Sequence, residues 1–346
     1  MGQVDVTVMG AGVFGLSVAW ACIGKGARVR IIDPNGVGNG ASGGILGALA
    51  PHVPENWNSK KQFQLECLFE ADAFWGAVEQ GSGQDTGFGR TGRLQPVLDA
   101  HALDLARQRA RNAETLWQGR ATWRLIPAED AGPWAPVSPT GWLIEDGLSA
   151  RIHPRRATRA LAAACAANGS SVEAGGTTQG AVVWATGYLG LRDMSSMLGK
   201  TVGTGIKGQA ALLDHGTTDS PQLFADGIHI VPHADGTTAV GSTSERVFDA
   251  PETTDFQIDD LIARAVELVP ALRDANVVER WAQVRPRAKS RAPMLGAWPG
   301  RPGHFVANGG FKIGFGMVPG VARVMADLIC DGVDRIPPEF RVDASL

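Results

Sequence analysis

The 346-residue sequence lacks the features that mark several other classes of protein. It has no apolar run near the roughly 18 residues that a membrane-spanning helix needs. Its 32 basic and 35 acidic residues give a formal net charge of -3, without the basic excess used to bind nucleic acid or anionic membranes. Its four cysteines form no CxxC pair, so they indicate neither a metal site nor a disulfide framework. We therefore expect no nucleic-acid partner, no membrane partner and no metal.

The length and start of the chain set two further expectations. A length of 346 residues allows one large or two ordinary domains with a sizeable core. The first apolar run begins at about residue 4, which leaves no room for a secretory signal peptide. The expected location is therefore cytoplasmic. The sequence allows a homo-oligomer but does not specify one.

What the sequence does contain is a strand, a glycine loop, a helix and a second strand within its first 33 residues. The apolar run 4–9 leads into Gly10-Ala11-Gly12-Val13-Phe14-Gly15, which has the pattern GxGxxG. An apolar helical pattern over 16–23 follows, and the second run, 27–32, stops at Asp33. This order matches the unit that binds the ADP half of a dinucleotide.

Each part of this unit has a physical task. Gly10 permits the tight turn, Gly12 lets the backbone approach a pyrophosphate, and Gly15 lets the helix pack closely on the sheet. The helix N-terminus offers unpaired N–H groups to the phosphates, and Asp33 can accept hydrogen bonds from a ribose. The alternative is a purely structural βαβ unit.

Other small-residue segments follow predicted strands. Residues 36–52 are rich in Gly, Ala and Ser, so their backbone amides can approach a flat or charged ligand; the alternative is a flexible surface loop. The turn 185–187 and the loop 309–316 each follow an apolar strand, which brings them to one edge of a parallel sheet. Residues 200–300 instead alternate short strands with turns and predict a mixed or antiparallel sheet.

Apolar periodicity and turn residues predict the remaining elements. We expect helices at 59–79, starting at a Ser59 cap, and at 101–117, 155–168, 258–268 and 319–330. We expect strands at 91–97, 142–144, 181–184, 208–213, 228–231, 237–240, 277–284 and 304–307.

Five segments in order resemble one protein family. They are 4–15, 40–42 with 47–49, 185–187, Arg285-Pro286 before 293–296, and 309–312. Together they resemble the D-amino acid oxidase/glycine oxidase superfamily of FAD-dependent amine oxidoreductases, over the whole chain. The residues alone indicate a dinucleotide enzyme, and FAD as the cofactor comes from the resemblance.

The resemblance implies an α/β fold of the glutathione-reductase/D-amino acid oxidase type. A discontinuous Rossmann-like FAD-binding domain would comprise 1–75, 145–200 and 300–346, and a mixed or antiparallel substrate domain 76–144 and 201–299. The cysteine segments do not match those that bear covalent flavin in relatives, so non-covalent FAD is expected. Segment 168–181 is shorter than the family pattern, so its adenine contact cannot be assigned.

The resemblance also implies which residues touch the cofactor. They lie in the glycine loop, at the end of the second strand, in the two small-residue segments and in the closing loop. The expected contacts are Gly10, Ala11, Gly12, Val13, Phe14, Gly15, Asp33, Pro34, Ala41, Ser42, Gly47, Ala48, Leu49, Ala185, Thr186, Gly187, Gly310, Phe311, Lys312, Ile313, Gly314 and Phe315.

The implied reaction transfers a hydride from the Cα of a small amine or amino acid to flavin N5. Imine hydrolysis and flavin reoxidation follow, with oxygen or another electron acceptor as partner. Arg285 is the first candidate to bind a substrate carboxylate, because guanidinium can donate two parallel hydrogen bonds. Arg287 is a weaker candidate, on the same strand face if the strand continues through Pro286, which can disrupt it. Lys312, His52 and His229 are further candidates for contacts with substrate or flavin, against structural or solvent-exposed alternatives.

Two other enzyme functions are compatible with the sequence, and a catalytically idle flavin protein or binding module is the last alternative. Segments 40–43 and 47–51 also resemble the FAD domain of a bifunctional tRNA wobble-uridine modification enzyme, although its methyltransferase domain is missing from this sequence. A nicotinamide-dependent dehydrogenase is the other alternative. Its Rossmann domain is normally contiguous, whereas the ligand-type turns here are widely separated in the chain.

Overall fold

The computed structural model describes residues 3–346 and divides most of its strands between two large sheets. The first sheet has six strands in the order β15-β16-β9-β1-β2-β8. Its neighbours run parallel, except that the edge strand β15 is antiparallel to β16. The strands are β1 (Val6–Met9), β2 (Val29–Ile32), β8 (Val172–Glu173), β9 (Ala181–Trp184), β15 (Met294–Ala297) and β16 (His304–Asn308).

Helix α1 (Val13–Gly24) connects β1 to β2, which pair in parallel with Val6 opposite Val29. The helix also packs against α4 (Pro154–Ala167) and α7 (Gly314–Asp331), so little of it reaches solvent. This explains why its sequence is apolar around most of its circumference. Helix α2 (Ser59–Ser82) packs against α4 and α7 and extends the same core.

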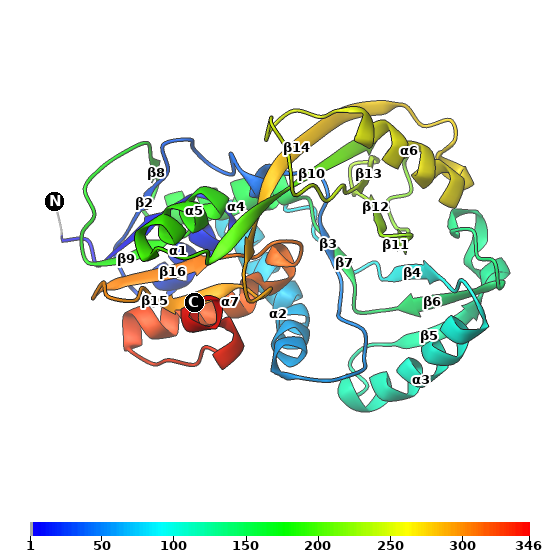
Figure 1. Cartoon of the computed structure of the whole chain (residues 1–346), viewed down its shortest axis with the longest axis horizontal. Coiled ribbons are helices and arrows are strands. Elements are labelled where there is room, and N and C mark those ends of the chain that lie inside the picture. Colours follow the sequence, from blue (N-terminus) through cyan, green and yellow to red (C-terminus); the bar gives the residue numbers. More distant parts are fainter. Residues whose placement is uncertain (1–2) are drawn as a thin grey trace.

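The second sheet has eight strands in the order β14-β10-β13-β12-β11-β4-β6-β5. Neighbours are antiparallel apart from the parallel pair β11 and β4, which makes it a mixed sheet as predicted. Figure 1 shows the long strands β10 (Gly203–Leu213) and β14 (Val277–Ala288) crossing from the first sheet to the second. The others are β4 (Arg93–Pro96), β5 (Trp123–Pro127), β6 (Trp142–Asp146), β11 (Gln222–Ala225), β12 (Ile228–Pro232) and β13 (Thr238–Gly241).

Three helices and one small sheet complete the arrangement. Helix α3 (Ala100–Leu116) packs on β5, and α6 (Phe256–Leu268) packs on β10, β12 and β13. Helix α5 (Gly187–Leu198) follows β9 and contacts β10 and β14. The two-stranded sheet of β3 (Ala48–Leu49) and β7 (Ala150–Arg151) joins segments that are distant in sequence. In the part of the chain that the structure describes, no helix is both long and apolar enough to span a bilayer.

Several element boundaries differ from the sequence prediction. Asn58, not Ser59, caps α2, because its side chain accepts a hydrogen bond from Lys61 N at 3.1 Å. Helix α7 begins at Gly314 rather than at Pro319. Pro319 has no backbone N–H to donate within the helix, but the packing of α7 against α1 and α2 outweighs this loss. The short strand β11 was not predicted at all; its four residues are a strand only because β12 and β4 flank them.

Strand β14 continues through Pro286 to Ala288 instead of ending at Val284. It is an edge strand, where a proline is tolerated. Strand β15 lies before the predicted domain boundary at residue 300 but pairs with β16 in the first sheet. The division into two domains stays a prediction. Within that division, we assign β15 to the FAD-binding domain because of this pairing.

A close helix contact gives a test of the packing. A β-carbon at Gly320 of α7 would lie 2.5 Å from Cys67 Sγ and 2.7 Å from Phe63 Cζ of α2. We expect Gly320→Ala to lower the free energy of unfolding by about 1–3 kcal/mol, the usual cost of overpacking a core. Urea denaturation measures this change.

The matched control is Gly76→Ala on the exposed side of α2, where no atom lies within 4 Å of the added carbon. It should raise the stability by up to about 1 kcal/mol, because alanine is the better helix former. A Gly320→Ala protein as stable as wild type would contradict the close α2–α7 contact.

Candidate active site

A cavity of about 860 Å³ lies where the carboxyl ends of the parallel strands face the second sheet. Met9, Ile32 and Trp184, the last residues of β1, β2 and β9, line it on one side. Ala210 of β10 and Trp281 of β14 line it on the other. The carboxyl edge of a parallel sheet is the usual ligand site in such folds, and this volume suits an extended organic ligand.

The glycine loop approaches the neighbouring backbone so closely that side chains are excluded. Gly10 has φ +112°, and a β-carbon there would overlap the carbonyl oxygen of Ala185. A β-carbon at Gly15 would overlap the carbonyl oxygen of Gly10. These contacts bring the ends of β1 and β9 and the start of α1 together at the cavity wall.

The N-terminus of α1 faces this cavity with little capping. Its N-cap residue, Gly12, has no side chain to offer, and Ser42 Oγ accepts a hydrogen bond from Val13 N at 3.0 Å. The remaining first-turn N–H groups and the positive end of the helix are therefore available to an anion. Both Gly12 and Ser42 line the cavity, so the arrangement fits a bound pyrophosphate.

Asp33 organises the same loop from the end of β2. One carboxylate oxygen accepts from Ala11 N at 2.8 Å and the other from Asn35 N at 2.9 Å. Each oxygen keeps a further lone pair, and Asp33 lines the cavity. The residue can thus hold the glycine loop and accept a ribose hydroxyl at the same time. The residues present fit the ADP half of FAD.

Most of the predicted cofactor residues line this one cavity. They are Gly10, Gly12, Val13, Phe14, Asp33, Pro34, Ala41, Ser42, Gly47, Ala48, Ala185, Thr186, Gly187, Gly310, Phe311, Lys312, Gly314 and Phe315. Gly314 and Phe315 belong to the first turn of α7 rather than to a loop. Four others do not line it: Ala11 and Leu49 are buried in the core, Gly15 packs on Gly10, and Ile313 packs against the main core.

Arg285 of β14 lies in the cavity wall with its charge unopposed by a direct carboxylate partner among residues 3–346. Its guanidinium donates to Ser242 Oγ at 2.6 Å and to the carbonyl oxygens of Thr243 at 2.6 Å and Lys207 at 3.3 Å. Burial lowers the pKa of Arg285 to about 10, and nearby Glu245 partly opposes that shift. The group is therefore still charged near neutrality and can attract an anion.

Gly208 of β10, which the Arg285 guanidinium reaches, was not recognised from the sequence. A β-carbon at Gly208 would overlap the Arg285 guanidinium, so the glycine makes the space in which the arginine lies. The neighbouring Lys207 is buried and pairs with buried Glu245 at 3.3 Å and with exposed Asp255 at 3.6 Å. The pairing of β10 with β14 brings Gly208 and Arg285 together, and the sequence carries no local signal for it.

Two of the three other candidates line the same cavity. Desolvation and the positive charge of Arg285 lower the pKa of Lys312. Burial, with Arg93 and Lys312 nearby, lowers the pKa of His229 to about 3, and its buried Nδ1 has no hydrogen-bond partner. His229 is therefore neutral at ordinary pH and able to donate or accept one hydrogen bond.

His52 lies elsewhere. It is exposed, it does not line the cavity, and its backbone N donates to Gln64 Oε1 at 2.9 Å. The prediction that His52 contacts the substrate is therefore not supported by its position. Within residues 3–346 no group of three or more His, Cys, Asp or Glu side chains is arranged to hold a metal ion.

Comparison with known protein families identifies the family of this chain. The profile of the DAO family, described as FAD dependent oxidoreductase, matches residues 5–328. The chain belongs to this family. As a DAO-family protein it is an FAD-dependent oxidoreductase, which confirms the predicted cofactor and weighs against the nicotinamide alternative.

Relatives of known name agree with this family. The chain is 28% identical to glycine oxidase of Pseudomonas aeruginosa over 365 residues, covering 96% of each chain. It is also 28% identical over 357 residues to the bifunctional protein ThiO/ThiG of Synechocystis, covering 94% of this chain and 52% of that protein. The chain thus spans about half the length of the bifunctional relative.

Solved structures share the fold. Glycine oxidase from Geobacillus kaustophilus superposes with a TM-score of 0.85 at 21% identity, covering 99% of each chain. Iminodiacetate oxidase from Chelativorans superposes with a TM-score of 0.83 at 20% identity, covering 96% of this chain and 97% of that one. These likenesses confirm the predicted fold class, a Rossmann-like sheet beside a mixed sheet.

The role of Asp33 can be tested through FAD affinity. We expect Asp33→Ala to raise the Kd for FAD about tenfold or more, because a charged acceptor is lost from both the glycine loop and the ribose site. Titration of the FAD-free protein with FAD measures this. Asp260→Ala makes the same change of charge at an exposed position on α6 and should leave the Kd unchanged. Equal FAD affinity in the two variants would remove Asp33 from the cofactor site.

Proposed function

We propose that this protein oxidises a small amine or amino acid that carries a carboxylate, of the glycine, sarcosine or D-amino acid type. The observation that carries the proposal is the presence of two positively charged side chains and one neutral histidine in the cavity wall. Arg285, Lys312 and the neutral His229 share one cavity with the glycine loop. Relatives named glycine oxidase, and the structural neighbour named iminodiacetate oxidase, support a carboxylate-bearing amine.

The protein side chains bind and orient this substrate. Arg285 attracts the carboxylate, held in place by Ser242, Thr243 and Lys207 so that little side-chain freedom is lost on binding. Lys312 adds a second positive charge to the same wall. His229, which is neutral, can accept or donate a hydrogen bond at the substrate amine without adding charge.

FAD, held by the glycine loop, Ser42 and Asp33, would supply the redox chemistry as the acceptor of the hydride that leaves the substrate Cα, with oxygen as the expected final acceptor and hydrogen peroxide as the product. The protein's own contribution is alignment and exclusion of water around the reacting carbon. The imine that leaves the site hydrolyses to a carbonyl compound and ammonia or an amine. No acid–base pair in the protein is required for these steps.

The visible spectrum tests this proposal. Anaerobic addition of glycine, sarcosine or a D-amino acid should bleach the flavin bands of the wild-type protein. Arg285→Ala should keep its FAD but need more than about tenfold higher substrate for half-maximal bleaching, the scale of a lost charge-assisted pair. Arg285→Lys keeps the charge without the bidentate geometry. Its substrate concentration for half-maximal bleaching should lie between those of the wild type and Arg285→Ala.

Two outcomes would count against the proposal. Flavin bands that none of these amines bleach would reject the substrate class while leaving the family unchanged. An unchanged half-maximal concentration in FAD-loaded Arg285→Ala would show that the carboxylate binds elsewhere.

The pKa shifts predict a pH dependence of carboxylate binding. Acetate, which has no amine to titrate, should inhibit as a substrate mimic. Its inhibition constant should rise at alkaline pH, because deprotonation of Lys312, at a pH below the ordinary value of 10.5, removes one attractive charge. It should be flat between about pH 6 and 7, where acetate is fully ionised and His229 stays neutral.

The control for this prediction is Lys312→Met. This variant should bind acetate more weakly near neutrality and show a shallower alkaline rise, leaving only the titration of Arg285 near its pKa of about 10. An inhibition profile identical to that of the wild type would remove Lys312 from the carboxylate site.

A further inference from the structure

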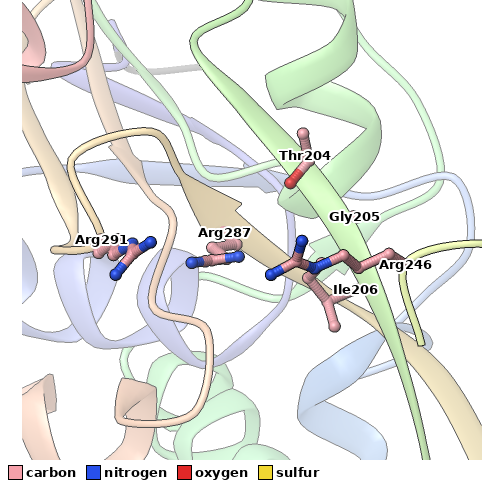
Figure 2. A pocket seen from close by; sticks show the side chains of 6 residues that line it. All are labelled: Thr204, Gly205, Ile206, Arg246, Arg287 and Arg291. Carbon is pink, nitrogen blue, oxygen red and sulfur yellow. The ribbon is translucent and has the colours of Figure 1, made fainter. Parts of the chain in front are cut away.

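A second cavity, of about 350 Å³, lies beside β10 and β14, outside the cofactor cavity. It is lined by Thr204, Gly205, Ile206, Arg246, Arg287 and Arg291. Figure 2 shows the guanidinium groups of Arg291, Arg287 and Arg246 following one another along this pocket. None of the lining residues is acidic. The pocket therefore concentrates three positive charges without an internal counter-charge.

These arginines differ from most others in the protein. Arg155 pairs with Glu279 at 2.6 Å, Arg109 with Glu55 at 2.5 Å, and Arg30 with Glu173 at 3.0 Å. Within residues 3–346, Arg246, Arg287 and Arg291 form neither a salt bridge nor a side-chain hydrogen bond. Like charges gathered in one concave site repel each other and focus a positive potential, which an anionic ligand relieves.

The three side chains come from segments whose backbones are held in place. Arg287 lies on β14, paired with Thr204 of β10. Arg291 follows in a turn, where its own φ of 60° is left-handed. Arg246 is adjacent to Glu245, whose carboxylate binds Lys207 at 3.3 Å and Gln209 at 3.0 Å. The backbone that carries the three arginines is thus positioned before any ligand arrives, which lowers the entropic cost of binding.

We propose that this pocket binds a small molecule that carries oxyanion groups with at least two negative charges. Guanidinium groups only donate hydrogen bonds, so the ligand must present acceptors, and phosphate and carboxylate oxygens match their fork geometry. Three positively charged guanidinium groups attract a ligand with several negative charges more strongly than a ligand with one carboxylate. The volume restricts the ligand to a small phosphate compound or a polycarboxylate. This inference does not depend on the amine substrate proposed above.

Phe311, which lines the cofactor cavity, lies close to an arginine of each cavity. The guanidinium carbons of Arg285 and Arg287 each lie 5.6 Å from the ring centroid of Phe311. Phe311 N also donates to Pro286 O at 3.0 Å, which ties the loop bearing Lys312 to the strand bearing Arg287. A ligand in the pocket therefore lies next to the segment that forms the substrate wall.

Calorimetric titration of the FAD-loaded protein with pyrophosphate and with citrate tests the proposal. Bound FAD keeps pyrophosphate out of the cofactor's own phosphate site. We expect saturable binding of at least one probe with one ligand per chain, weakened by added sodium chloride. Acetate, with one charge, should bind at this pocket far more weakly than either probe.

The variant Arg246→Gln/Arg291→Gln should weaken probe binding about tenfold or more, since two charge-assisted contacts are lost. Arg273→Gln removes one exposed arginine at the end of the short 3-10 helix Pro270–Leu272, outside the lining of the pocket, and should change the affinity less than about twofold. Both substituted residues in the double variant are exposed, and an unchanged flavin spectrum verifies its fold.

The relative affinities of the two probes distinguish the two classes of ligand. Preference for pyrophosphate assigns a phosphate compound, and preference for citrate assigns a polycarboxylate; either supports the pocket. Absence of saturable binding by both probes overturns the proposal, as does equal affinity in the double variant and the wild type. Because binding is measured without turnover, failure of amine oxidation would not affect this result.

Discussion

The contact of one backbone with another at Gly10 is the constraint on which the rest of the structure depends. The end of β1, the start of α1 and the turn after β9 meet there with no space for a side chain. This contact directs the N-terminus of α1 at the cavity and places Asp33 where it can hold the loop. The electrostatic site for a pyrophosphate follows from backbone packing and needs no basic side chain.

The cavity wall that contains Arg285 depends on how charge is distributed along β10 and β14. Acidic residues near Arg285 are engaged elsewhere: Glu245 and Asp255 neutralise buried Lys207. Arg285 is held by uncharged acceptors, so its position is defined while its charge stays available to a ligand. A direct carboxylate partner would have neutralised the charge that the substrate needs.

The same strand serves two cavities. Because β14 passes through Pro286 without a break, Arg285 and Arg287 project from one face, two residues apart. Both guanidinium carbons lie 5.6 Å from the ring centroid of Phe311, which belongs to the loop that carries Lys312. The strand thus places one arginine in the wall of the cofactor cavity and the next in the three-arginine pocket.

The sequence by itself determined the parts of this protein that rest on local chemistry. The βαβ unit, its glycine loop and Asp33 could be predicted, since turn, close approach and helix start are each encoded within a few residues. The closing loop and Arg285 could be identified by their resemblance to the family.

Tertiary structure alone decided the rest. Gly208 matters only because β10 pairs with β14, and β11 is a strand only between its neighbours. His52 is exposed and does not line the cavity, although it follows the cofactor segment closely in sequence. The three-arginine pocket joins residues of three separate segments. Contacts between distant segments depend on strand register and packing, and no local pattern of residues encodes these.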